Sequence, residues 1–281
     1  MDLLVSCDWL AEDLGAPDLR VVDATAFLPG TPRDPHAEYR AGHIPGALWL
    51  DLPTLHDPDD PRPAMVPSNA LFAARMAALG IGEDDRIVVY DNSPLSSSGR
   101  AWWLFRLFGA RAVAIHDGGL AQWVAQGRPL ETGDAVPGAS QGFTARRNDD
   151  AIATKADLIA NLASCAAQVV DARGGARFRG EAAEPRPGMA AGHIPGSVNL
   201  PTDQLLDAQG LWKRGPALEA AFAQAGVELG KPLVMSCGSG VTACNLLFGA
   251  ALLGKTDVTI YDGSWSEWGM DPDTPKAKGP A

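Results

Sequence analysis

The chain has 281 residues, and 46% of them are hydrophobic, which is enough for two domains that each bury a core of their own. Its formal net charge of −11 argues against nucleic acid or an anionic membrane as a partner, since both are bound by clustered Lys and Arg. The first 13 residues lack the basic flank and apolar run of a secretory signal or transit peptide, and no segment reaches the roughly 20 apolar residues of a membrane span. We therefore expect a cytoplasmic protein with reduced cysteines.

Helical and strand patterns alternate along both halves of the chain. In the first half the expected strands are 19–23, 47–51, 86–90 and 112–115, and the expected helices are 6–14, 68–79, 100–108 and 120–126. In the second half the expected strands are 168–171, 197–199, 232–236 and 257–260, and the expected helices are 154–163, 216–225 and 242–253. Short apolar strands that alternate with helices predict an α/β fold, with a mostly parallel sheet covered by helices on both faces.

Three motifs occur once in each half, in the same order: Val-Val-Asp-Ala (21–24 and 169–172), Gly-His-Ile-Pro-Gly (42–46 and 192–196), and a seven-residue motif that begins Asp-Gly and ends in Trp (117–123 and 262–268). A repeat of this length is a whole domain rather than a solenoid turn. We predict two similar domains, at residues 1–130 and 151–281. The Gly-, Pro- and Ser-rich stretch between them, 131–150, is expected to be a linker.

The segment 237–242 reads Cys-Gly-Ser-Gly-Val-Thr and lies between an expected strand and an expected helix. Ligands of parallel sheets bind beyond the carboxyl ends of the strands. Gly238 and Gly240 let the backbone turn its N–H groups inward, and the following helix adds the positive end of its dipole. The loop therefore predicts an anion-binding cradle with Cys237 as a nucleophile.

The equivalent position of the first half holds Asp91 instead of a cysteine. The segment after it, 92–100, is longer than the second loop and contains a proline, which removes one N–H donor. Only the second half is therefore expected to be catalytic.

The other three cysteines show no Cys-x-x-Cys spacing and no spacing with histidine that would indicate a metal site or a disulfide framework. Cys7 and Cys165 fit amphipathic helices and are expected to be buried and inert, and Cys244 is expected to pack in the core. No metal ligand is predicted.

The repeated motifs and the Cys237 loop resemble, nearly end to end, the tandem-domain form of the rhodanese sulfurtransferase family. The segments that carry the resemblance are Tyr-x-x-x-His-Ile-Pro-Gly-Ala at 39–47, Tyr-Asp-Gly-Ser-Trp-Ser-Glu-Trp at 261–268, and the loop 237–242. The resemblance implies two rhodanese-like domains, the first non-catalytic, and sulfur transfer through a persulfide on Cys237. It implies no metal or organic cofactor.

Within that family, the uncharged loop is similar to that of the mercaptopyruvate-specific members, whereas thiosulfate-specific members typically carry Arg and Lys after the cysteine. Thiosulfate has two negative charges beside its transferred sulfur, which cations inside the loop would complement. Mercaptopyruvate has one carboxylate, some distance from its sulfur. The resemblance therefore implies transfer from 3-mercaptopyruvate to cyanide or to a thiol acceptor, such as a small thiol or a thioredoxin-like protein, with release of pyruvate.

Four arginines crowd one segment of this acidic chain: Arg173, Arg177, Arg179 and Arg186. Arg177 and Arg186 match family arginines that hold the carboxylate and carbonyl of mercaptopyruvate, while Arg173 and Arg179 are expected to be structural. The alternative for all four is pairing with acids such as Glu181 and Glu184. In the loop, the backbone of Gly238, Gly240, Val241 and Thr242 is expected to contact the transferred sulfur.

Asp34, His43 and Ser239 match a proton relay proposed for the family, with the first two residues supplied by the first domain. A functional histidine needs an orienting carboxylate and a target, which this set would provide. Because a histidine precedes Ile-Pro-Gly in both halves, His43 and its counterpart His193 have a second interpretation, in which they fix a turn.

Three other functions remain open from the sequence. A thiosulfate sulfurtransferase is the nearest, and substrate kinetics distinguish it. A cysteine phosphatase of similar fold would need an arginine six residues after the nucleophile, where this chain has Ala243. A non-catalytic binding module would be expected to have lost Cys237, which is present.

Overall fold

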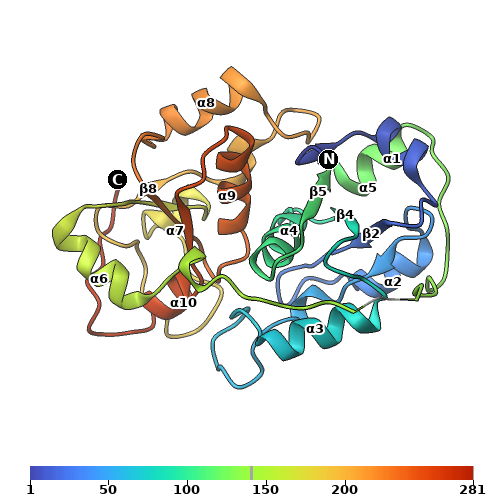
Figure 1. Cartoon of the computed structure of the whole chain (residues 1–281). Helices are drawn as coiled ribbons and strands as arrows, with labels where there is room; N and C mark the ends of the chain where they lie inside the picture. The colour runs from blue at the N-terminus through green and yellow to red at the C-terminus, as the bar shows by residue number, and fades with distance from the viewer. Residues whose placement is uncertain (140–141, 281) are drawn as a thin grey trace. The chain divides into compact units, whose positions relative to one another are not determined.

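The chain forms two compact units in the computed structural model, which describes residues 1–139 and 142–280 (Figure 1). The N-terminal unit comprises Met1–Asp57 and Val66–Asn148, and the C-terminal unit comprises Pro58–Met65 and Asp149–Ala281. The segment Pro58–Met65 is held in the C-terminal unit by Arg62, which pairs with Asp60 and with Glu267. A short segment of the first half of the chain thus belongs to the C-terminal unit, which the internal repeat alone does not reveal.

Each unit contains one parallel five-stranded sheet, and the two sheets have the same strand order. In the N-terminal unit the order is β1-β5-β4-β2-β3, formed by β1 (Leu4–Val5), β2 (Leu19–Asp23), β3 (Leu48–Trp49), β4 (Arg86–Tyr90) and β5 (Ala112–His116). In the C-terminal unit it is β6-β10-β9-β7-β8, formed by β6 (Ile152–Ala153), β7 (Gln168–Asp171), β8 (Val198–Asn199), β9 (Leu233–Ser236) and β10 (Val258–Tyr261). The predicted α/β repeat is confirmed.

Helices follow the strands in both units. The N-terminal unit contains α1 (Cys7–Asp13), α2 (Pro35–Ala41), η1 (Leu52–Thr54), α3 (Asn69–Ala78), α4 (Ser98–Leu107) and α5 (Gly119–Ala125). The C-terminal unit contains η2 (Asp149–Ala151), α6 (Lys155–Ser164), α7 (Gly175–Phe178), η3 (Thr202–Leu205), α8 (Gly215–Gln224), α9 (Ala243–Leu252) and α10 (Ser264–Trp268). Ser6, Ser68 and Thr154 cap their helices by accepting a backbone N–H, as the sequence predicts for residues of this type.

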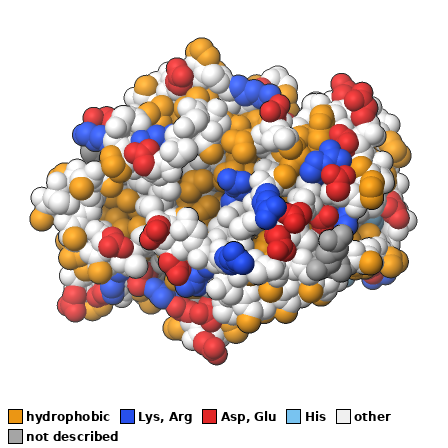
Figure 2. Space-filling model, in the orientation of Figure 1, with side chains coloured by type: hydrophobic (Ala, Val, Ile, Leu, Met, Phe, Trp, Pro, Cys, Tyr) orange, Lys and Arg blue, Asp and Glu red, His pale blue; other side chains and the backbone are white. Residues whose placement is uncertain are grey.

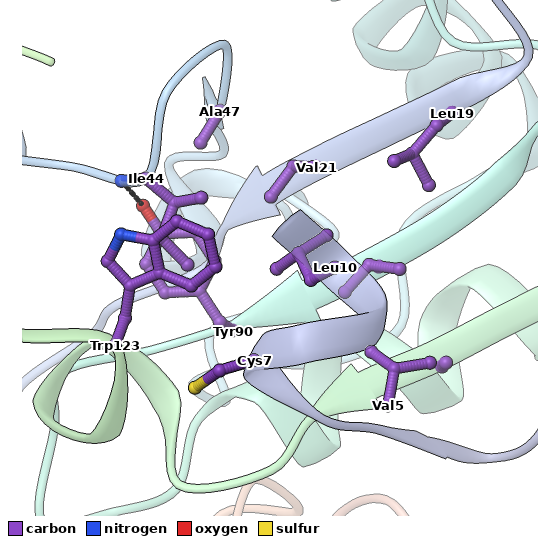
Figure 3. Packing of buried hydrophobic residues seen from close by; sticks show 11 residues of the cluster. Val5, Cys7, Leu10, Leu19, Val21, Ile44, Ala47, Tyr90 and Trp123 are labelled. Carbon is purple, nitrogen blue, oxygen red and sulfur yellow. Dashed lines mark hydrogen bonds between the residues drawn. The ribbon is translucent and has the colours of Figure 1, made fainter. Parts of the chain in front are cut away.

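The two faces of the N-terminal sheet have separate aromatic cores. On one face, Figure 3 shows Leu10 of α1 and Trp123 of α5 beside Tyr90 of β4, and all three are buried. On the other face, Phe72 of α3 stacks on Phe108 with ring centroids 4.2 Å apart. Helices therefore cover both faces, as predicted for a parallel sheet.

The C-terminal unit is built in the same way. Trp265 and Trp268 of α10 pack with Leu158 of α6 on one face of the sheet. Phe222 of α8 and Phe248 of α9 are both fully buried and come from the other pair of helices in Figure 1. The tryptophans of the repeated motif thus serve as core residues.

The segment that was predicted to link the domains contacts the N-terminal unit at several of its described residues. Glu131 forms an antiparallel bridge with His43, and Phe143 packs edge-on against Phe72. The N–H of Asn148 donates to the carbonyl of Leu107, at the end of α4. The C-terminal unit then begins at Asp149.

The expected burial of Cys165 is wrong. α6 ends at Ser164, and Cys165 caps it in the left-handed conformation with φ 50°. Because the chain turns away from the helix at this residue, the side chain leaves the apolar face that the helical pattern assigned to it. Cys165 is exposed.

On the face shown in Figure 2, basic side chains lie beside acidic ones rather than in one broad basic field. Surface pairs include Arg86 with Asp18 and Arg179 with Glu181. Within residues 1–139 and 142–280, no helix has the length and hydropathy of a membrane span.

Candidate active site

Cys237 is the first residue after β9 and begins the loop that leads into α9. Its N–H donates to the hydroxyl of Ser264 at 3.1 Å, and its carbonyl accepts from the N–H of Trp265 at 2.9 Å. The carbonyl of Gly238 accepts from the N–H of Ser266, also at 2.9 Å. The first residues of α10 therefore fix the start of the loop, and Cys237 is itself buried.

Most backbone donors of this loop point to no protein acceptor. Within the described part of the chain, the N–H groups of Gly238, Ser239, Val241 and Thr242 make no hydrogen bond. Gly240 has a φ of 77°, a left-handed conformation that favours glycine and reverses the chain ahead of α9. Free N–H groups beside the start of a ten-residue helix are what an anion-binding cradle requires, and anion binding here stays a prediction.

The side chains of Cys244, in α9, and of Ser239, in the loop, differ in their hydrogen bonding. The Cys244 thiol is fully buried and donates to the carbonyl of Gly240 at 3.2 Å, which ties the loop to α9. The Ser239 side chain is half-buried, and its hydroxyl makes no hydrogen bond to any residue in the described ranges. Ser239 can therefore contact a ligand, whereas Cys244 is a packing residue.

Arg177 projects from α7 toward the loop. A Cβ atom built on Gly238 would lie 3.2 Å from the Nη2 atom of Arg177, so the missing side chain at 238 makes room for the guanidinium. The same Nη2 atom donates to Oε2 of Glu184 at 2.5 Å, and Nε donates to it at 3.2 Å. The structure thus brings Arg177 and the Cys237 loop together.

Arg186 is half-buried and makes no hydrogen bond or ion pair within the described part of the chain. Burial lowers the pKa of its guanidinium and the positive charge of Arg177 lowers it further, while Cys237 and Glu184 act in the opposite direction. Arg186 therefore lies within electrostatic reach of both Arg177 and Cys237. Its hydrogen-bond donors are free for a ligand.

Glu184 is the residue of this site whose importance the sequence did not indicate. Its side chain is only 2% exposed, and its Oε1 accepts from Nη1 of Arg173 at 2.7 Å while Oε2 accepts from Arg177. Arg173 also pairs with Asp171 and lies over the ring of Trp265 at 4.5 Å. Glu184 thus connects a buried structural arginine to the arginine beside the loop.

Asp34 and His43 lie in the N-terminal unit, at opposite ends of α2. Asp34 caps the helix, accepting from the N–H groups of His36 and Ala37. His43 is fully buried, with Nδ1 2.9 Å from the carbonyl oxygen of Tyr39. Because α2 has seven residues, its ends are roughly 10 Å apart, and no hydrogen bond joins the Asp34 carboxylate to the His43 ring.

His43 and His193 have the same surroundings in the two units. Each ring stacks on an aromatic residue of the preceding helix, His43 on Tyr39 at 4.1 Å and His193 on Phe178 at 3.8 Å. Each Nδ1 contacts the carbonyl of that aromatic residue, at 2.9 Å in both cases. These contacts support the turn-fixing interpretation. The Nε2 atom of His43 has no hydrogen-bond partner in the described ranges.

All four cysteines are free thiols. Among the residues that the structure describes, no group of three or more His, Cys, Asp or Glu side chains could hold a metal ion.

The chain belongs to the rhodanese family. The model of the rhodanese-like domain matches it twice, over residues 6–126 and 154–271. The first match contains β2 to β5, and the second contains β7 to β10 and the Cys237 loop.

Relatives of known activity match this chain over nearly its whole length. The 3-mercaptopyruvate sulfurtransferase of Homo sapiens is 44% identical over 273 residues, which cover 95% of this chain and 92% of the human protein. The thiosulfate sulfurtransferase of Bos taurus is 42% identical over 272 residues, covering 94% and 91%. The crystal structure of SseA, a 3-mercaptopyruvate sulfotransferase from Escherichia coli, is 40% identical with a TM-score of 0.85 and covers 95% of this chain and 100% of SseA. Because relatives with either donor match almost equally well, the donor must be inferred from the site.

Proposed function

We propose that this chain is a sulfurtransferase that takes sulfur from 3-mercaptopyruvate, holds it as a persulfide on Cys237, and passes it to a thiol or cyanide. The observation that carries the proposal is the position of Arg177, whose guanidinium lies against the uncharged residue Gly238 beside the nucleophile. The activities of the human and Escherichia coli relatives support the same reaction.

The first half-reaction is an attack of the Cys237 thiolate on the sulfur of mercaptopyruvate. A sulfur–sulfur bond forms while the carbon–sulfur bond breaks, and its electron pair moves onto the methylene carbon to give the enolate of pyruvate. A proton converts the enolate to pyruvate, and Cys237 retains the outer sulfur. The free N–H groups of the loop stabilise negative charge on the cysteine sulfur before the transfer and on the persulfide after it.

Arg177 and Arg186 hold the carboxylate and carbonyl of the donor in this proposal. Guanidinium groups bind carboxylates with two parallel hydrogen bonds, which fix orientation as well as charge. Arg186 has free donors within the described ranges, and Arg177 keeps Nη1 available because its bonds to Glu184 use Nε and Nη2. Together they orient the donor so that its sulfur faces Cys237.

The second half-reaction is an attack of an acceptor on the outer sulfur. The sulfur–sulfur bond breaks, the acceptor leaves as a persulfide or as thiocyanate, and the Cys237 thiolate is regenerated. Neither step needs a metal or an organic cofactor. A sulfur donor and an acceptor follow from the reaction class, and we propose a small thiol or a thioredoxin-like protein as the acceptor.

The proton that quenches the enolate has two proposed sources. One is the Asp34, His43 and Ser239 relay that the resemblance implies, although Asp34 here caps α2 and makes no hydrogen bond with the His43 ring. The other is the Ser239 hydroxyl with solvent, in which case His43 serves only the fold. His43→Gln distinguishes them. The relay predicts a lower kcat and a changed pH profile with mercaptopyruvate, whereas the fold role predicts only a lower melting temperature of the N-terminal unit.

The donor assignment is tested by comparing kcat/KM for mercaptopyruvate and thiosulfate with the same acceptor. We expect mercaptopyruvate to be preferred by about tenfold or more, which corresponds to roughly 1.4 kcal/mol of transition-state binding. A preference for thiosulfate would make the chain a thiosulfate sulfurtransferase, like its bovine relative.

We also propose a cytoplasmic location. The four cysteines of the chain are free thiols, which is the usual state in a reducing compartment. Fractionation of cells that express the protein at its natural level checks this.

A further inference from the structure

Glu184 is a buried carboxylate held between two arginines. With 2% of its side chain exposed, it accepts from Arg173 on one oxygen and from Arg177 on the other. Both of its oxygens are occupied by protein donors, so its charge cannot be screened by water. It therefore determines both the orientation and the effective charge of Arg177.

The charges around the loop can be counted. Three guanidinium groups, those of Arg173, Arg177 and Arg186, accompany two carboxylates, those of Asp171 and Glu184. One net positive charge remains among these side chains when the Cys237 thiolate itself is not counted. That charge matches the single carboxylate of mercaptopyruvate and falls one short of the two negative charges of thiosulfate.

We propose that Glu184 is a specificity-determining residue: by neutralising one of the guanidinium groups at the Cys237 loop, it favours a monoanionic sulfur donor over a dianionic one. The inference rests on the proposed function. A dianion loses more hydration than a monoanion when it enters a half-buried site, and it needs a second unpaired cation in return. Glu184 withholds that cation, which is discrimination against the wrong donor rather than attraction of the right one.

Glu184→Gln tests the proposal, because the amide keeps the size and one acceptor oxygen while it removes the negative charge. We expect the ratio of kcat/KM for thiosulfate to that for mercaptopyruvate to rise about tenfold or more. Mercaptopyruvate turnover should fall in absolute terms, since Arg177 loses a charged hydrogen bond that holds it in place. A fall of both activities in parallel, in a folded variant, would show that Glu184 is only structural.

Glu181→Gln is the matched control. Glu181 lies three residues earlier, pairs with Arg179, and has 56% of its side chain exposed, so the substitution makes the same change of net charge away from the loop. For Glu181→Gln we expect the thiosulfate-to-mercaptopyruvate ratio of kcat/KM to remain within about twofold of the wild-type value, since exposed pairs are screened by water. Equal shifts in the two variants would overturn the proposal, because the effect would then come from overall charge.

If Glu184→Gln does not fold, Ser239→Lys supplies one extra positive charge within the loop itself, at a side chain that is half-buried and unbonded in the described ranges. The charge count predicts a rise of the same ratio relative to Ser239→Ala, which lacks the hydroxyl but adds no charge. An unchanged ratio would overturn the charge count on which the role of Glu184 depends. The two claims are tested by different measurements. A wild-type preference for thiosulfate would refute the proposed function, whereas the role of Glu184 is tested by how the thiosulfate-to-mercaptopyruvate ratio of kcat/KM changes on substitution.

Discussion

The loops after β4 and β9 occupy equivalent places in the two units but begin with different residues. In the N-terminal unit, the Asp91 carboxylate accepts from the N–H groups of Ser93 and Ser98, at 2.8 and 2.9 Å. In the C-terminal unit the corresponding residue is Cys237, and the N–H groups that follow it are free within the described ranges. The anion-binding frame is therefore common to both units, and one unit fills it with its own carboxylate.

The backbone clamp on the loop is also repeated. The carbonyl of Asp91 accepts from the N–H of Leu120 at 3.1 Å, as the carbonyl of Cys237 accepts from Trp265. Gly119 approaches Asp91 so closely that a Cβ would lie 2.3 Å from its carbonyl oxygen. The comparison teaches that the fold positions the loop, while the residue at its first position and the arginines around it decide the chemistry.

The largest expected effect comes from exchanging the key residue of each loop. Cys237→Ser should reduce sulfur transfer by a factor on the order of 10³–10⁶, because the nucleophile that carries the sulfur is lost. Asp91→Cys in a Cys237→Ser background should restore nothing, since the two arginines of the equivalent segment, Arg33 and Arg40, are paired with Glu38 and Asp134. Turnover with mercaptopyruvate is measured for the single and the double variant. Recovered activity in the double variant would contradict the claim that only the C-terminal unit can be catalytic.

The sequence predicted β2 to β5 and β7 to β10, because most of them are continuous apolar runs, but it missed the two-residue edge strands β1 and β6. β2 and β4 begin and end at the predicted residues, 19–23 and 86–90. The seven-residue α2 was not predicted, since a polar helix this short has little hydrophobic periodicity. The sequence did contain a helix-start signal, because Asp34 is a capping residue and the proline after it is favoured in the first turn of a helix.

The candidate site was predictable only in part. The Cys237 loop is a continuous motif, so its place between strand and helix could be read directly from the sequence. The function of Glu184 could not, because it depends on side-chain contacts with Arg173 and Arg177, 11 and seven residues away. Such contacts depend on the path of the chain after α7, and this irregular segment has no hydrophobic periodicity from which its path could be predicted.

The next largest effect concerns Arg177 and Arg186, near the Cys237 loop. Arg177→Lys and Arg186→Lys keep the charge but lose the planar pair of donors. Each should cost on the order of 1.5–3 kcal/mol in kcat/KM for mercaptopyruvate, or about 10- to 150-fold. Arg179→Lys is the control, since its guanidinium pairs with the exposed Glu181, and it should leave the kinetics unchanged. Unchanged kinetics in a folded Arg177→Lys, Arg186→Lys double variant would contradict the assignment.

A smaller effect is expected from closing the space beside Arg177. Gly238 does not have a positive φ, so the backbone tolerates alanine there, but the new Cβ would lie 3.2 Å from Nη2 of Arg177. Gly238→Ala should shift the guanidinium and raise KM for mercaptopyruvate about fivefold, or roughly 1 kcal/mol. Gly230→Ala, where a Cβ would meet nothing within 4 Å, should not change KM. Equal KM values for the two variants would show that the packing at 238 is unimportant.

The smallest expected effect on catalysis, and a clear one on stability, comes from the carboxylates that end β2 and β7. Burial raises the pKa of the Asp23 carboxyl from 3.8 to about 6, although the Thr25 hydroxyl and N–H oppose the shift. The folded form thus binds a proton more tightly than the unfolded form, and the free energy of unfolding should fall as pH rises from about 4 to 6. The fall is up to about 3 kcal/mol for a shift of two units.

Asp23→Asn should remove that fall and stabilise the N-terminal unit at pH 8, as measured by chemical denaturation at several pH values. Asp171→Asn is the counterpart in the C-terminal unit and should destabilise it at pH 8, because Asp171 pairs with the buried Arg173. If the two substitutions change stability in the same direction, the difference between the units is not electrostatic.

The location of the transferred sulfur tests the central claim most directly. The protein is incubated with mercaptopyruvate in the absence of an acceptor and then digested, and the masses of its cysteine-containing peptides are measured by mass spectrometry. The account predicts one added sulfur atom, on the peptide that contains Cys237, with Cys7, Cys165 and Cys244 unmodified. Added sulfur on any of those three, with Cys237→Ser still active, would contradict it.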